Sequence, residues 1–162
     1  MARILGDADF CKNAANAYLQ TAIYCNEVGK STINQTFQCS SQSFFSIPAI
    51  MNVAFACELF LKAICLRTKS DGALRGHDLF MLYKDLKMTQ KTELEKVFRS
   101  HCLFESVTLE STLKNHCNVF KEWRYIYENE KVSNPSAYEV YIDNLLAAAG
   151  SLKEYVDTIK TP

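Results

Sequence analysis

Residues 47–66 read IPAIMNVAFACELFLKAICL and are apolar on nearly every side of a helix. A helix of this kind lies either at the centre of a bundle or in a membrane. Its length would span a bilayer, but Glu58 and Lys62 lie within it and the chain has no second span. We therefore expect the central helix of a soluble bundle, with no membrane partner.

The composition indicates one compact, helix-rich domain. The chain has 162 residues, is 48% hydrophobic, and contains only five Gly and three Pro. Lys+Arg and Asp+Glu balance at 18 each, so no overall field draws the protein to polyanions, and any such ligand would need a local basic patch. Seven cysteines without a C-x-x-C and an amino terminus unlike a signal peptide predict reduced thiols in the cytoplasm.

Apolar periodicity predicts an all-α, up-and-down bundle of four main helices with one or two short ones. The main helices are expected at 7–28, 47–69, 109–128 and 136–160. The short ones are expected after the GHDL of residues 76–79 and over about 89–101. No strand-like alternation competes with this pattern, and the domain is expected to cover 1–162.

The first helix is predicted to end at Gly29. Its expected apolar stripe consists of Phe10, Ala14, Ala17, Tyr24 and Val28, with Thr21 as its one polar member. The stretch that follows, KSTINQTFQCSSQSFF, is rich in Ser, Thr and Gln, so we expect a polar loop over 29–46.

Charged residues interrupt two apolar stretches. Glu58 and Lys62 stand one turn apart on the most apolar helix, either as an ordinary surface pair or as part of a shared polar site. His77 and Asp78 open a short helix, where they serve as a cap or contribute to a site.

The stretch FKEWRYIYEN at 120–129 places Arg124 and Glu128 one turn apart among aromatic side chains. The planar fork of an arginine suits a phosphate or a stacked base. The alternative is that Arg124 pairs with Glu58 or Glu128 to join two core helices. We predict that Arg124 approaches Glu58, with Glu128 and Lys62 completing the charge balance.

Three motifs carry a family resemblance: AFACELFLKA at 54–63, GHDLFMLYKDL at 76–86 and FKEWRYIYE at 120–128. Their types and order resemble the HEPN superfamily, in particular the branch with E-x-x-x-K, GHDL and WRY-x-YE motifs. The resemblance covers about residues 7–160. It implies a bundle of four or five helices, commonly a homodimer, in toxin–antitoxin or anti-phage defence systems.

Active HEPN toxins resemble metal-independent ribonucleases with an R-x4–6-H motif. Arg124 fits the arginine, but Asn129 stands where the histidine belongs, and no histidine follows. The resemblance therefore implies a catalytically degenerate domain that binds RNA, a nucleotide or a partner protein. Its binding residues would be Glu58, Lys62, His77, Asp78, Arg124, Tyr125, Glu128 and Asn129.

Two alternatives stay open beside the degenerate domain. One is an active ribonuclease that uses Arg124 with His77, and the other is an antitoxin-like or scaffold protein without a ligand. The resemblance implies a homodimer, with a cognate antitoxin or a nucleotidyltransferase as partner and no cofactor. We expect no metal, although the pairs His101–Cys102 and His116–Cys117 raise a zinc site as an alternative.

Overall fold

The computed structural model describes residues 7–33, 41–68, 76–120 and 142–159, with the backbone alone at 31–33 and 41–46. All regular secondary structure in these ranges is helical, so the predicted all-α fold is confirmed. The helices are α1 (Ala8–Ile33), α2 (Ser41–Arg67), α3 (Leu79–Lys84), α4 (Met88–His101), α5 (Leu109–Asn115) and α7 (Ile142–Thr158).

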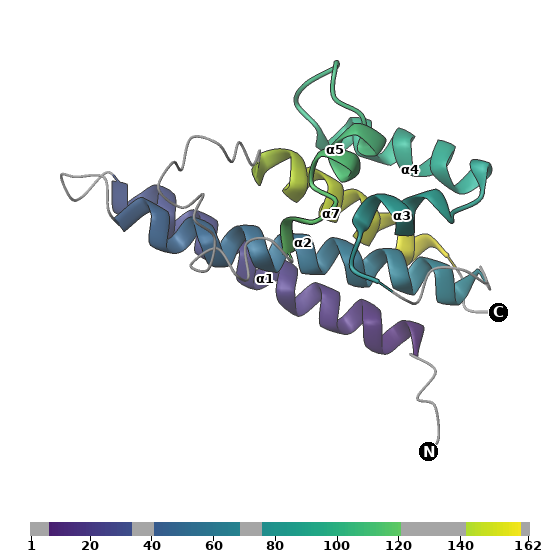
Figure 1. Cartoon of the computed structure of the whole chain (residues 1–162), viewed down its shortest axis with the longest axis horizontal. Coiled ribbons are helices and arrows are strands. Elements are labelled where there is room, and N and C mark those ends of the chain that lie inside the picture. Colours follow the sequence, from purple (N-terminus) through teal and green to yellow (C-terminus); the bar gives the residue numbers. More distant parts are fainter. Residues whose placement is uncertain (1–6, 34–40, 69–75, 121–141, 160–162) are drawn as a thin grey trace.

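Helix α2 lies at the centre of the bundle. It packs against α1, α3 and α7, and α7 in turn packs against α4 and α5. In Figure 1, α1 and α2 run side by side along the long axis, and α3, α4 and α5 lie beyond α2 on the side away from α1. Side chains on several faces of α2, including Val53, Phe60 and Ile64, are fully buried. The central position predicted for this helix is therefore confirmed.

The segment Ile47–Arg67 of α2 is long and apolar enough to cross a membrane by length and composition alone. Two thirds of its most apolar window is buried inside the bundle, which is also typical of the core helix of a soluble protein.

The apolar stripe predicted for α1 is wrong. Phe10 and Tyr24 are exposed, whereas Ala15, Leu19 and Ala22 are the buried residues. The small side chains of the two alanines let the α1 backbone lie close to α2, and the aromatic rings are left on other faces. The buried face of α1 is therefore shifted by one residue along the sequence, so that Ala15 and Ala22 are buried where Ala14 and Thr21 were predicted.

The polar loop predicted over 29–46 is helical at both of its described ends. Helix α1 continues through Gly29 to Ile33, and α2 begins at Ser41 and contains Pro48. Gly29 is buried, so packing outweighs the cost of about 1 kcal/mol that a glycine adds to a helix interior. Residues 34–40 lie outside the described part of the chain.

The helix predicted over 109–128 is interrupted: α5 stops at Asn115, a turn follows at 116–118, and residues 119–120 are helical again at the edge of the described range. His116 ends the helix, with its ring Nδ1 2.7 Å from the carbonyl oxygen of Thr112. The carbonyl of Cys117 then accepts a hydrogen bond of 3.1 Å from the backbone N–H of Leu79, the first residue of α3. The turn therefore holds the start of α3.

The short helices were predicted correctly, as α3 follows GHDL and α4 covers Met88–His101. The last helix is described from Ile142, so its predicted start at residue 136 falls within 121–141, outside the described residues.

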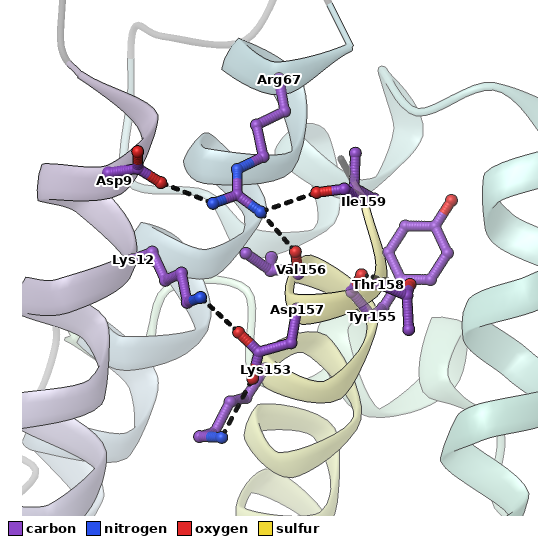
Figure 2. A network of polar contacts seen from close by, with 9 residues as sticks. All are labelled: Asp9, Lys12, Arg67, Lys153, Tyr155, Val156, Asp157, Thr158 and Ile159. Atoms are coloured by element: carbon purple, nitrogen blue, oxygen red, sulfur yellow. Dashed lines mark hydrogen bonds and ion pairs between the residues drawn. The ribbon is translucent and has the colours of Figure 1, made fainter. Parts of the chain in front are cut away.

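An arginine at the end of α2 joins three helices (Figure 2). The Arg67 side chain is only 6% exposed, and its Nη1 donates to the carbonyls of Val156 and Ile159 at 2.5 and 3.0 Å. Its Nη2 lies 2.6 Å from Oδ1 of Asp9 on α1. Arg67 thus places a positive charge at the carboxyl end of α7 and satisfies carbonyls that the helix leaves unpaired.

A second contact in Figure 2 links α1 to α7. The Lys12 Nζ lies 2.5 Å from Oδ1 of Asp157, and the Lys153 Nζ lies 3.2 Å from its Oδ2. The hydrogen bond from Lys12 is the main cause that lowers the pKa of Asp157. Together with Arg67, this carboxylate fixes α7 against the amino-terminal half of α1.

Candidate functional site

Glu58 is the charged residue at the centre of the candidate site. It lies on α2 and is only 1% exposed, and its neighbours Cys57 and Leu61 on the same helix are fully buried. A buried carboxylate must be paired, because its desolvation costs several kcal/mol. The contacts of Glu58 therefore decide what the site can do.

Lys62 supplies the first partner from the next turn of α2. Its Nζ lies 2.6 Å from Oε1 of Glu58, and its side chain is 15% exposed. This distance is short for an N–H···O contact and typical of a charge-assisted hydrogen bond. Of the two interpretations that the sequence allowed, the structure favours the shared polar contact over a solvated surface pair.

His77 supplies the second partner from a different part of the chain. Its Nδ1 lies 3.0 and 3.1 Å from Oε1 and Oε2 of Glu58. The His77 side chain is 60% exposed, although the carboxylate that it contacts is buried. An exposed histidine is thus oriented by the carboxylate of a buried residue of α2.

The GHDL motif explains how His77 reaches Glu58. Gly76 has φ +118°, a conformation that side-chain-bearing residues rarely adopt. Asp78 caps α3, since its Oδ1 accepts a 2.9 Å hydrogen bond from the backbone N–H of Met81, and Leu79 is buried in the core. The glycine turn, the cap and the apolar anchor fix the backbone on both sides of His77.

A row of aromatic rings leads from α1 to His77. The ring of Tyr18 meets that of Phe55 edge-on at 4.6 Å, and Phe55 stacks on Phe120 at 4.7 Å with an interplanar angle of 15°. The centroid of the Phe120 ring lies 6.1 Å from that of His77. The imidazole therefore has the carboxylate of Glu58 on one edge and an aromatic neighbour beside it.

This arrangement defines the chemistry available at His77. A carboxylate only accepts hydrogen bonds, so the contact with Glu58 requires a proton on Nδ1. In the neutral ring, Nε2 then carries the lone pair and is the nitrogen free to accept a proton or a hydrogen bond. An exposed, oriented imidazole of this kind can contact a phosphate, stack with a base or transfer a proton.

The structure thus brings Glu58, Lys62 and His77 together, with Asp78 next to them as a helix cap. The remaining predicted site residues, Arg124, Tyr125, Glu128 and Asn129, lie outside the described residues. The approach of Arg124 to Glu58 stays a prediction.

Sequence reasoning missed the aromatic row. Phe55 lies one turn before Glu58 on α2, and Phe120 opens the stretch FKEWRYIYEN, so both belong to motifs that the sequence singled out. Their contact joins the first motif to the third and could not be inferred from spacing within either one.

Within the described ranges, no group of three or more His, Cys, Asp or Glu side chains could hold a metal ion. His101 lies 2.9 Å from Oε2 of Glu154, and His116 lies against the carbonyl of Thr112. The imidazole rings of His101 and His116 therefore contact protein oxygens.

Comparisons with family models, curated proteins and solved structures found no match to this chain. The HEPN resemblance therefore rests on the three sequence motifs alone and stays a prediction.

Proposed function

We propose that this chain is a catalytically degenerate HEPN-like domain that binds RNA or a nucleotide at His77. The observation that carries the proposal is that His77 is exposed at 60% and yet is fixed by the buried carboxylate of Glu58. A ring that is held before its ligand arrives loses little conformational freedom on binding. An ordinary surface histidine would have no such support.

The neighbours of His77 suit a nucleotide. Phe120 stacks on Phe55 beside the imidazole, and bases stack on aromatic side chains in proteins that bind single strands. Glu58 contacts Nδ1 of His77, which leaves Nε2 to accept a hydrogen bond from a base edge or, when it is protonated, to donate one to a phosphate. In the resemblance, Arg124 would add the guanidinium that binds phosphate.

The family resemblance supplies the biological setting of the proposal. It supports a homodimer in the cytoplasm, within a toxin–antitoxin or anti-phage defence system, with a cognate antitoxin or nucleotidyltransferase as partner. Sedimentation equilibrium at micromolar concentration tests the dimer. A species of twice 18.4 kDa is expected, and a species of 18.4 kDa alone would contradict it.

Binding is tested by the fluorescence anisotropy of a fluorescein-labelled single-stranded RNA in EDTA. His77→Ala should weaken binding by about 5- to 150-fold, because one stacked base contributes about 1–3 kcal/mol. His101→Ala is the matched control, since His101 also lies beside a carboxylate, that of Glu154, at a different place. Equal affinities for wild type and His77→Ala would refute the proposed site.

A second candidate function is an active, metal-independent ribonuclease that uses His77 with Arg124. The observation that favours it is the contact between Nδ1 of His77 and Glu58, because a carboxylate of this kind orients an imidazole for proton transfer. Wild type would then shorten a mixed RNA in EDTA, and His77→Gln or Arg124→Ala would abolish cleavage. Binding without cleavage by the wild type supports the degenerate domain.

A further inference from the structure

Helices α3, α4 and α5 line an open groove of about 670 Å³. Glu58, Lys62 and His77 do not line it. Its walls include Tyr83, which is buried, and Met88, whose side chain is 76% exposed at the start of α4. An exposed methionine beside a groove offers an adaptable apolar contact.

Positive charge predominates along this groove. Four cations line it (Lys84, Lys91, Lys96 and Arg99) against two carboxylates (Glu95 and Glu110). The overall charge of the chain is zero, so the excess is local.

The carboxylates do not neutralise all of these cations. Arg99 lies 3.0 Å from Glu95, whose other oxygen accepts the backbone N–H of Leu109. Lys96 lies 2.7 Å from Glu93 on its own helix. Two of the four cations are therefore already paired.

The other two cations, Lys84 and Lys91, have no carboxylate within ion-pair distance in the described ranges. The Lys84 Nζ stands over the ring of Phe80 at 5.5 Å, and the Lys91 Nζ stands over the ring of Tyr83 at 5.4 Å. Lys91 also donates to the carbonyl of Lys84 at 2.8 Å. Aromatic and backbone contacts thus position the two ammonium groups without cancelling their charge.

We propose that this groove binds an acidic peptide segment of a partner protein. Carboxylates of the segment would meet Lys84 and Lys91, and an apolar side chain would lie against Met88. A single-stranded nucleic acid fits less well, because among the described residues that line the groove Tyr83 alone is aromatic and its ring is buried, which disfavours stacking of a base. The phosphates alone would then have to supply the binding.

The test uses a fluorescein-labelled peptide of glutamate and leucine residues and the same peptide with glutamine for glutamate. The acidic peptide should bind the full chain with an affinity that falls as salt is added, and the glutamine peptide should not bind. Lys84→Gln/Lys91→Gln should weaken binding by about tenfold, the value expected when two surface ion pairs are lost.

The matched control is Lys30→Gln/Lys153→Gln. It changes the net charge equally, and neither lysine is among the residues that line the groove, since the two lie in exposed pairs with Asp143 and Asp157. It should bind the acidic peptide like the wild type.

A second variant adds negative charge to the groove at the position expected to meet the segment. Met88→Glu places a carboxylate on an exposed position of the groove, so it should weaken binding without changing the thermal melting curve. Equal binding of both peptides, equal loss in the control variant, or no effect of Met88→Glu would overturn the proposal. So would a labelled single-stranded RNA that binds through Lys84 and Lys91 when the peptide does not.

Discussion

Replacing Lys62 with methionine should cost more stability than replacing Glu58 with glutamine, because Glu58 is the buried partner of the pair. Lys62→Met leaves a carboxylate that is 1% exposed, with His77 as its one remaining ion-pair partner among the described residues. Breaking a buried pair from one side costs about 3–5 kcal/mol, and His77 offsets part of this, so we expect about 3 kcal/mol. Glu58→Gln keeps the shape and an oxygen acceptor, so we expect about 1–2 kcal/mol.

Urea melts of the two single variants and of the double variant measure this asymmetry. The double variant should cost less than the sum of the singles, because it leaves no unpaired carboxylate. Lys96→Met is the control, since Lys96 and Glu93 are both exposed and their pair contributes at most about 1 kcal/mol. Equal and small effects of Lys62→Met and Lys96→Met, or additive effects in the double variant, would refute the reasoning.

Arg67→Met should destabilise the fold by about 3 kcal/mol, because a buried guanidinium holds the last carbonyls of α7. Asp9→Ala should cost less, because Arg67 keeps both carbonyl contacts, and equal urea midpoints of the two variants would contradict this. Burial lowers the pKa of His116 in the folded chain below its usual value near 6.5. As the pH is lowered, the unfolded chain therefore binds the proton first, and the free energy of unfolding decreases. Urea melts between pH 7 and pH 5 should show a flatter dependence for His116→Gln than for wild type, and parallel curves would count against this account. Burial raises the pKa of Cys57 to about 12, so a thiol reagent followed by mass spectrometry should leave Cys57 unmodified in the native protein; rapid labelling would show that the thiol is accessible.

The fold could be predicted where a stretch of sequence is compatible with a single structure. Residues 47–66 are apolar all round and lie at the centre of the bundle, and Asp78 caps α3 as its residue type suggests. Helix α1 carries two overlapping stripes, one with large rings and one with small side chains. Because α1 packs closely on α2, the stripe of Ala15 and Ala22 is the buried one.

The rest depended on contacts between segments that are distant in sequence. Nothing local to Arg67 shows that the end of α7 lies beside it, because Val156 stands 89 positions later and no pattern in the sequence pairs the two. In the candidate site, the apolar surroundings of Glu58 made a cation necessary, and the sequence offered Arg124 and Lys62, of which Lys62 lies in the described part of the chain. The contact with His77 needed the turn at Gly76, which only the folded chain shows.

The most direct test of the account is whether the ring of His77 itself meets the nucleic acid. Long-range proton–nitrogen correlation spectra report on the ring nitrogens of the three histidines separately. Titration with a short single-stranded RNA should shift the Nε2 resonance of His77, while the buried ring of His116 keeps its position. The proposed site is wrong if RNA binds and the His77 resonances do not move. It is also wrong if the protein does not bind RNA at all.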